Sequence, residues 1–396
     1  MITATKIRIY PDTKQVEKLA KAFGCARWFW NNSLVETQKT YNETGKGLGQ
    51  FALNARLPGL KKEFEWLKET HSQVLQSVSL NLTRAFINFF ERRAAYPNYK
   101  SKHSRQSIQY PQGVKIVDGR KLFLPKIGHV KAIVHREIIG VIKTVTISKA
   151  STGKYFASIL TENGMDAPTI SFDGKVVGVD VGLTHLVNTS DGDKFDNPKH
   201  VAKAQKNLKR KQKKLSRKMK DSNSRNKARI LVAKVHEKVA NARKDYLHKL
   251  SRRLVDENQV IVVEDLHVKG MMKNHCLAKS ISDAGWGMFT TMLKYKAERV
   301  GKGYVEVNRF FPSSKSCSCC GHVVKSLPLN IRNWECIECG VEHDRDINAA
   351  KNIALEAQRM IAAGIAGAAS RGNVRSNTGR KSSICSVADE AGSPVL

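Results

Sequence analysis

The stretch VVGVDVG, residues 176–182, has the pattern of a strand that is buried on both faces. Its apolar run ends at Gly182, which suits a tight turn. Asp180 lies at the end of this run, where burying a charge without a partner costs free energy. Two further strands are predicted downstream, LVNTSDGDKF (186–195), which closes in an Asp-Gly turn, and the almost wholly apolar NQVIVVEDL (258–266). This part of the chain is therefore predicted to be an α/β domain.

Two more carboxylates occupy positions comparable to that of Asp180. Glu264 lies near the end of the third strand, with Asp265 directed to the opposite face if the strand continues. Asp346, preceded by Asp344, begins the helical run INAAKNIALEAQRM. Each has a simple structural explanation, because aspartates often cap turns and helices.

Taken together, Asp180, Glu264 and Asp346 favour a catalytic interpretation. Carboxylates that converge from two strand ends and a helix start repel one another and become protonated unless cations neutralise them. Two Mg²⁺ ions about 3.5 to 4 Å apart do this, and they are the usual apparatus for phosphodiester hydrolysis. The three acids therefore predict a magnesium-dependent nuclease.

Four cysteines precede the third carboxylate in two Cys-x-x-Cys pairs. Fifteen residues separate Cys317 and Cys320 from Cys336 and Cys339. Each pair can present two thiolates to one metal ion, so the spacing predicts a structural zinc ribbon without an open coordination position. Cys319 does not fit the Cys-x-x-Cys spacing and is interpreted as not being a metal ligand. The remaining cysteines are isolated: Cys25, Cys276 and Cys385.

The chain carries 68 lysines and arginines against 35 acidic residues, a formal net charge of +33. This excess predicts a polyanionic partner, with nucleic acid as the first candidate and a membrane surface as the second. The sequence shows neither the ~18 consecutive apolar residues of a spanning helix nor, in MITATKIRIYPDTKQ, the apolar region of a secretory signal. A cytoplasmic, reducing compartment is expected, where clustered cysteines are better interpreted as metal ligands than as disulfides.

Much of the positive charge falls in residues 201–230, which hold thirteen Lys/Arg and one acid. A charge run is usually a solvated helix face, but these cations would repel one another unless phosphates lay alongside. The helix has a thin apolar seam, formed by Leu208, Leu215 and Met219. A better core-facing stripe follows and predicts the second helix of a hairpin: Val232, Val235, Val239, Ala242 and Tyr246. The predicted nucleic-acid contacts are Lys209, Arg210, Lys213, Lys214 and Arg217.

The first 170 residues are predicted to contain a helical part and a β-rich part. Residues 3–10 alternate as a strand, and Pro11-Asp12-Thr13 then opens helices that continue to about residue 94. Short β-like runs from 95 to 170 predict a small barrel or sandwich. Between these parts, tyrosines alternate with cations, a mixture that suits base stacking and phosphate contacts, although an ordinary solvated loop is the alternative. The candidate binding residues there are Tyr96, Tyr99, Lys100, Lys102 and Arg105.

Over about residues 1–360 the order of motifs resembles the TnpB family, transposon-encoded RNA-guided DNA endonucleases similar to the type V CRISPR effectors. The resemblance rests on RIYPDTKQ, GCARWFWNNSL and KDYLHKLS, and on the series GVDVG, VVEDL, SISDAGWGMF, FFPSSKSCSCCG, CIECG and HDRDINAAKNI. It implies a RuvC-like nuclease core of RNase H fold, interrupted before its third acidic motif by the zinc ribbon.

The resemblance also implies a multidomain α+β and α/β organisation. Its expected parts are a β-barrel, wedge-like domain (1–12 and 95–171), a helical recognition lobe (13–94), the RuvC-like nuclease domain (172–312 and 341–364), the four-cysteine zinc ribbon (313–340) and a tail of disordered composition (365–396).

Carried over by motif, Asp180, Glu264 and Asp346 are the metal-binding catalytic acids. Asp344 is less suitable, because the family's acid stands two residues before an asparagine, here Asn348. The implied protein is a bacterial or archaeal, nucleoid-associated enzyme encoded by an insertion sequence. It would use Mg²⁺ and a guide RNA to cleave double-stranded DNA beside a short adjacent motif. A transposase with the same acids and a nuclease-inactive RNA-guided repressor remain alternatives, although all three acids are present.

Overall fold

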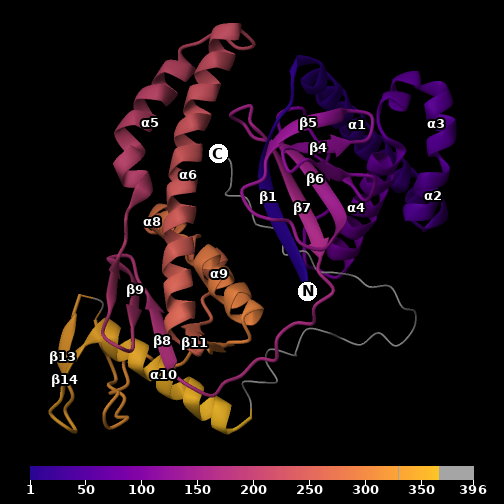
Figure 1. Cartoon of the computed structure of the whole chain (residues 1–396). Coiled ribbons are helices and arrows are strands. Elements are labelled where there is room, and N and C mark those ends of the chain that lie inside the picture. Colours follow the sequence, from indigo (N-terminus) through magenta and orange to yellow (C-terminus); the bar gives the residue numbers. More distant parts are fainter. Residues whose placement is uncertain (329, 365–396) are drawn as a thin grey trace. The chain divides into compact units, whose positions relative to one another are not determined.

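The structure, a computed structural model, describes residues 1–328 and 330–364. The predicted disordered tail, 365–396, and Cys385 within it lie outside the described residues. The chain divides into two compact units (Figure 1). The first contains residues 1–167 and 200–244, and the second contains residues 168–199, 245–328 and 330–364.

Two long helices within residues 13–94 confirm the predicted helical region. α1 (Thr13–Thr44) begins after Asp12, whose side chain accepts a hydrogen bond from the Gln15 N–H (2.8 Å) while Gln15 accepts one from the Asp12 N–H (3.1 Å). This capping box fixes the helix start, and Gly45 ends the helix in a left-handed conformation. The second long helix is α4 (Ser72–Phe90), which packs against α1. Shorter helices lie between them: α2 (Gln50–Ala55), α3 (Leu57–Glu63) and a 3₁₀ helix (Glu65–Glu69).

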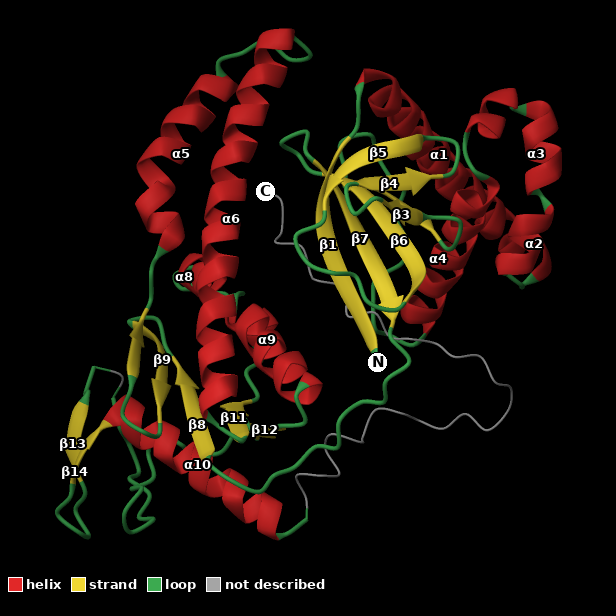
Figure 2. Ribbon diagram, viewed as in Figure 1, coloured by secondary structure: helices red, strands yellow, loops and turns green. Residues whose placement is uncertain are grey.

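A seven-stranded antiparallel sheet completes the N-terminal part of this unit (Figure 2). Its order is β2-β6-β7-β1-β5-β4-β3, so it is an open half-barrel with edges at β2 and β3 rather than the closed barrel considered from the sequence. The helices and the sheet share one hydrophobic core. The strands are β1 (Ile2–Tyr10), β2 (Gln106–Tyr110), β3 (Lys115–Val117), β4 (Lys121–Leu124), β5 (Gly128–Ile133), β6 (Val141–Lys149) and β7 (Tyr155–Glu162).

The basic region forms two helices as predicted, but their boundary and their buried stripe differ from the prediction. α5 (His200–Ser216) ends before residue 219, so Met219 lies in a turn and is exposed instead of extending an apolar seam. α6 (Asn223–Glu257) buries Val232 and Val235, as expected. Ala242 is exposed, and the buried face of α6 continues instead through Arg243, Leu247, Leu250 and Leu254.

The second unit is built on a five-stranded mixed sheet of order β10-β9-β8-β11-β12. β8 pairs in parallel with β11 and β11 in parallel with β12, whereas β9 is antiparallel to β8. The predicted strands at 176–182 and 258–266 are thereby confirmed, and 186–195 forms two strands of a hairpin rather than one. The strands are β8 (Val176–Val181), β9 (His185–Thr189), β10 (Lys194–Asp196), β11 (Val260–Glu264) and β12 (Gly303–Val307).

Different helices bury the two faces of this sheet. Val177, Val179 and Ile261 belong to a core with α6 and α9 (Trp286–Arg299). The even-numbered Val260 and Val262 pack in a second core with α10 (Arg345–Ala362). Side chains alternate across a strand, so residues 180 and 264 are directed toward the face that α10 covers.

The remaining elements of the second unit are short. They are α7 (Val268–Met271), α8 (Ala278–Ala284), β13 (Asn333–Glu335) and β14 (Glu342–Asp344), the last two forming an antiparallel pair. Among the helices that the structure describes, none is both long and apolar enough to cross a bilayer.

Candidate active site

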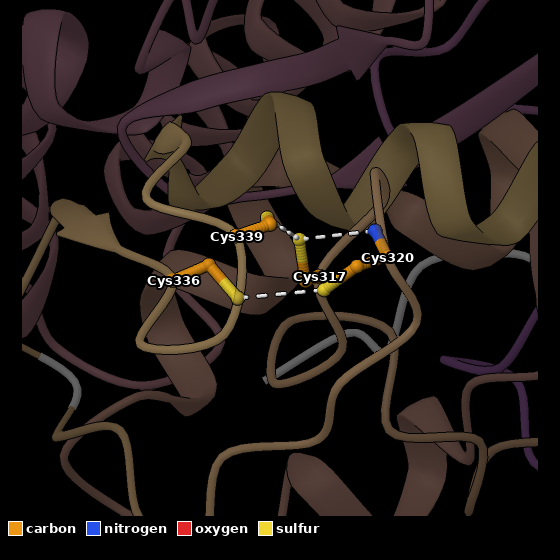
Figure 3. Close-up of side chains that lie close together, drawn as sticks. All are labelled: Cys317, Cys320, Cys336 and Cys339. Atoms are coloured by element: carbon orange, nitrogen blue, oxygen red, sulfur yellow. Dashed lines mark hydrogen bonds between the residues drawn. The ribbon is translucent and has the colours of Figure 1, made fainter.

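Two adjacent turns bring the four ribbon cysteines together. Figure 3 shows their side chains directed toward one another, and their sulfur atoms all lie within 4.8 Å of each other. The Sγ atoms of Cys317 and Cys339 are 3.6 Å apart, as are those of Cys320 and Cys336. A tetrahedral zinc ion with Zn–S bonds of about 2.3 Å requires S···S separations of about 3.8 Å. The four thiols therefore fit a tetrahedral metal ion.

The first of these turns also favours a thiolate. Burial raises the pKa of the Cys317 thiol, but hydrogen bonds from the backbone N–H groups of Cys320 and Cys319 outweigh burial and hold this pKa at about 7. A lower pKa makes metal binding easier, because the thiolate is the ligand form. Cys319 is exposed and does not belong to the four-cysteine group.

The three predicted carboxylates lie in a single pocket of the second unit. Asp180 comes from the end of β8, Glu264 from the end of β11 and Asp346 from the first turn of α10, and all three line this pocket. The parallel pairing of β8 and β11 brings the first two strand ends to the same edge of the sheet. α10 packs on β8 and supplies the third.

Two of the carboxylates have raised pKa values. Burial is the main cause that raises the pKa of Asp180 to about 7, and the negative charges of Asp346 and Glu264 add to it. Asn188, the partner of Asp180 in the β8–β9 register, and Arg345 act in the opposite direction. Burial and the adjacent Asp265 also raise the pKa of Glu264. Burial and nearby negative charges thus raise both pKa values, and a bound cation would offset both causes.

Asp344 and Asp346 have different surroundings despite being two residues apart. The Asp344 carboxylate is the N-cap of α10 and accepts hydrogen bonds from the N–H groups of Asp346 (3.1 Å) and Ile347 (3.0 Å). It also forms an ion pair with Lys194 (2.6 Å). Although burial raises the pKa of Asp344, these bonds outweigh it and lower the pKa. Asp344 is thus engaged in capping, whereas Asp346 lines the pocket.

Models of known families match several separate parts of the chain. Residues 158–275 match OrfB_IS605, described as "Probable transposase", and residues 286–353 match a "Cas12f1-like, TNB domain". Residues 1–46 match HTH_OrfB_IS605, described as "Helix-turn-helix domain", although here they form β1 and the single helix α1.

A curated relative extends the comparison to nearly the whole chain. The chain is 40% identical over 391 residues to a "Putative RNA-guided DNA endonuclease" of Streptomyces pristinaespiralis, an alignment that covers 96% of this chain and 94% of that protein. The chain belongs to the TnpB family. A second relative, the "Putative RNA-guided DNA endonuclease InsQ" of Escherichia coli (strain K12), is 32% identical over 381 residues, or 92% of this TnpB-family chain and 94% of that protein.

A solved structure shows a similar fold at low sequence identity. The "Cryo-EM structure of the Cas12f1-sgRNA-target DNA complex" contains a chain that is 14% identical, with a TM-score of 0.56 over 87% of this chain and 83% of that one. The TnpB-family chain therefore shares the overall fold of that protein.

The structure adds pocket residues that the sequence analysis did not identify. Four cationic side chains line the pocket with the carboxylates: Arg309, Lys315, Arg332 and Arg345. Arg332 pairs with Asp346 (3.3 Å) and Arg309 with Asp265. Phe310 lies on the same rim with 86% of its surface exposed. The motif FFPSSKSC contains some of these residues, but its pattern does not reveal which side chains face the acids.

Trp286 supports the turn that follows Asp180. This residue belongs to the motif SISDAGWGMF and is buried, and its Nε1–H donates to the carbonyl oxygen of Gly182 (3.3 Å). The contact connects the start of α9 with the turn between β8 and β9. The motif therefore has a structural function beside the carboxylates, which the sequence alone did not show.

The predicted nucleic-acid contacts belong to the first unit of this TnpB-family chain. Tyr99, Lys102 and Arg105 are exposed. Tyr96 packs edge-on against Phe86 and Phe89, at 5.6 and 5.3 Å between ring centroids. The Lys100 ammonium lies 3.6 Å from the centroid of the Trp30 ring. The five cations predicted in and beyond α5 are all exposed: Lys209, Arg210, Lys213, Lys214 and Arg217.

Proposed function

We propose that this protein is an RNA-guided, Mg²⁺-dependent DNA endonuclease that cleaves target DNA next to a short adjacent motif. The observation that carries the proposal is the gathering of Asp180, Glu264 and Asp346 in one pocket with cationic side chains at its rim. Support comes from two relatives named RNA-guided DNA endonucleases, which align with this chain over 94% of their length. A similar fold occurs in a Cas12f1 complex with sgRNA and target DNA.

The chemistry follows from the charges of the pocket. Asp180, Glu264 and Asp346 would hold two Mg²⁺ ions, which supply a water nucleophile at neutral pH and stabilise charge on the scissile phosphate. Asp180 must release its proton for this, and its pKa of about 7 makes the release possible at cellular pH. Arg309 and Lys315 at the rim would bind phosphates that flank the cleaved bond. Arg332 would exchange its pairing with Asp346 for a phosphate.

The other parts of the chain would hold and present the nucleic acids. On this proposal, residues 1–12 and 95–171 form the wedge-like domain and residues 13–94 the recognition lobe. The RuvC-like core of RNase H fold comprises residues 172–312 and 341–364, and the ribbon (313–340) holds a structural Zn²⁺ through Cys317, Cys320, Cys336 and Cys339. The exposed cations of α5 would neutralise phosphates of the guide RNA or its duplex with target DNA.

The decisive experiment purifies the full chain from cells that carry its own flanking DNA. The bound RNA is sequenced, and the complex is incubated with Mg²⁺ and plasmids that contain a matching target beside randomised bases. We expect a defined RNA and cleavage beside a defined adjacent motif, with cleavage abolished in Asp180→Asn. A protein that carries no RNA and joins DNA ends would instead be a transposase. A complex that binds the target without cutting it would be a repressor.

A further inference from the structure

Two asparagines of α10 attach this helix to the segment 313–320, which contains Cys317 and Cys320 and is called the first zinc knuckle below. The Asn348 Nδ2 donates to the carbonyl oxygen of Ser316 (2.7 Å), and its Oδ1 accepts from the Ser318 N–H (2.9 Å). The Asn352 Nδ2 donates to the carbonyl oxygens of Ser313 (2.8 Å) and Ser316 (2.6 Å). Both asparagines are buried, with 1% and 4% of their surface exposed. A buried amide that loses such partners is costly, so these bonds restrain both segments.

Asn348 and Asn352 lie on a different face of α10 from Asp346. Asn348 and Asn352 are four residues apart and therefore lie one above the other on one face of α10. Asp346 precedes Asn348 by two residues, which is about 200° around the helix at 3.6 residues per turn. One face of α10 thus holds the knuckle while another directs Asp346 into the carboxylate pocket.

A second contact joins the knuckle to the chain that enters α10. Cys317 lies between Ser316 and Ser318, the two residues that Asn348 contacts, and is 1% exposed. Its Sγ is 3.0 Å from the Nε2 of His343, which precedes the N-cap residue Asp344. The knuckle therefore contacts the chain three residues before Asp346, at His343, and two residues after it, at Asn348.

We propose that Asn348 and Asn352 are positioning residues through which an occupied zinc site holds the first turn of α10, and with it Asp346, in place. The metal ion in the ribbon then affects the carboxylate pocket only by fixing the position of α10. It takes no part in the cleavage reaction. The inference rests on the proposed function only where it treats Asp346 as a ligand of the catalytic cation.

The first test measures amide hydrogen exchange in the full chain with its bound RNA, before and after zinc is removed with a chelator. Wild type is compared with Asn348→Ala/Asn352→Ala, and with Asn258→Ala as the matched control. Asn258 is also buried (3% exposed), but it donates to a carbonyl of α6, at Leu254 (3.0 Å). The helix α9 serves as an internal reference within the same unit.

In wild type and Asn258→Ala, zinc removal should speed exchange about tenfold or more in residues 313–322 and in the first turn of α10, but not in α9. In the double variant the first turn of α10 should already exchange fast with zinc present, and zinc removal should change it less than about twofold. The proposal is overturned if zinc removal leaves α10 protected in wild type, or if the double variant responds as wild type does. If the double variant does not fold, Asn352→Ala alone, which keeps both Asn348 bonds, should give an intermediate response.

The second test measures Mn²⁺ affinity at the carboxylate pocket by calorimetry. Loss of residues that orient metal ligands typically weakens metal affinity about 10- to 100-fold, and we expect this range for the double variant and no change for Asn258→Ala. Unchanged affinity in the double variant would overturn the coupling to Asp346. If wild type binds no Mn²⁺ while zinc still controls exchange in α10, the nuclease proposal fails and the attachment stands.

Discussion

A Cβ atom on Gly178 would lie 2.0 Å from the carbonyl oxygen of Ala350. β8 and α10 therefore pack backbone against backbone at this point. β8 carries Asp180 two residues later, and α10 carries Asp346 four residues earlier. The close approach thus determines how far apart two of the three carboxylates lie.

The first prediction is that Gly178→Ala forces α10 away from the sheet. Overpacking of a core contact typically costs about 1–3 kcal/mol, so we expect the free energy of unfolding to fall by that amount and cleavage to fall with it. Denaturant unfolding and plasmid cleavage would measure both. Gly287→Ala in α9 is the control, because its Cβ would meet nothing within 4 Å. A helical alanine there should be neutral or stabilise by up to about 1 kcal/mol, and equal effects of the two substitutions would contradict the prediction.

The second prediction separates the two neighbouring aspartates. Asp346→Asn should reduce cleavage more than about a hundredfold, beyond the usual effect of residues that only orient metal ligands. Asp344→Asn keeps an equally good N-cap oxygen and should leave cleavage within about threefold of wild type. Its lost ion pair with Lys194 is partly exposed and should cost no more than about 1 kcal/mol. The measurement is the cleavage rate of each variant at saturating Mg²⁺. A stronger effect of Asp344→Asn than of Asp346→Asn would show that Asp344, not Asp346, binds the cation.

The third prediction concerns pH. Because the pKa of Asp180 is raised to about 7, cation binding must displace its proton at lower pH. Mn²⁺ affinity should rise about tenfold per pH unit up to about pH 7 and level off above it. Calorimetry between pH 5.5 and 8 would measure this, and an affinity independent of pH would contradict the raised pKa.

The raised pKa of Asp180 also makes the free energy of unfolding depend on pH. The part of this free energy that depends on Asp180 falls as the pH rises, whereas the Mn²⁺ affinity increases. In the cation-free protein, folded Asp180 holds its proton more tightly than the unfolded chain does. Its contribution to the free energy of unfolding is therefore fully present below about pH 4 and is lost as the pH rises through about 7. Asp180→Asn should lack this contribution, so the difference in free energy of unfolding between wild type and variant should fall as the pH rises from about 4 to about 7, measured by denaturant unfolding.

The fourth prediction concerns Phe310 at the rim of the carboxylate pocket. An aromatic ring with 86% of its surface exposed beside cations can stack on a nucleobase next to the cleaved phosphate. Stacking is worth about 1–3 kcal/mol per base, so Phe310→Ala should weaken binding of single-stranded DNA about 5- to 150-fold, whereas Phe310→Tyr should retain it. Fluorescence anisotropy with a short oligonucleotide would measure both variants, and a tyrosine variant as weak as the alanine variant would exclude stacking.

The fifth prediction concerns the exposed cations of α5. If they contact phosphates, their replacement by glutamine should weaken RNA binding and reduce the salt slope by about 0.7 to 0.9 per lost contact. The variant changes Lys209, Arg210, Lys213 and Lys214 together. Its control makes the same change of charge at exposed lysines of the second unit, namely Lys249, Lys269, Lys273 and Lys294. RNA titrations at several salt concentrations test it, and equal slopes for the two variants would show that the location of the charge is unimportant.

The sequence predicted the convergence of the carboxylates because the relevant patterns are local. Asp180 and Glu264 end apolar strands, and strand alternation directs both to one face. The clustering of Cys317, Cys320, Cys336 and Cys339 follows equally from their spacing. The role of the three acids as metal ligands remains a prediction.

Other features depend on tertiary contacts that local patterns do not encode. Asn348 and Asn352 look like ordinary polar helix residues until their partners in 313–318 are known. β2 is hard to recognise in the sequence, because QSIQY buries only Ile108 and Tyr110. Met219 was predicted to extend the apolar stripe of α5, because the lysines and arginines around it do not indicate the turn at 217–222.

The order of the carboxylates along the chain has a consequence for synthesis. Asp180 and Glu264 leave the ribosome well before Asp346, which follows the whole ribbon. Since α10 supplies the third carboxylate and covers one face of the sheet, a chain that stops within the ribbon holds two acids and lacks the helix that completes the pocket. On the proposed function, unfinished or prematurely terminated copies of the protein would therefore lack a complete site for the catalytic cation.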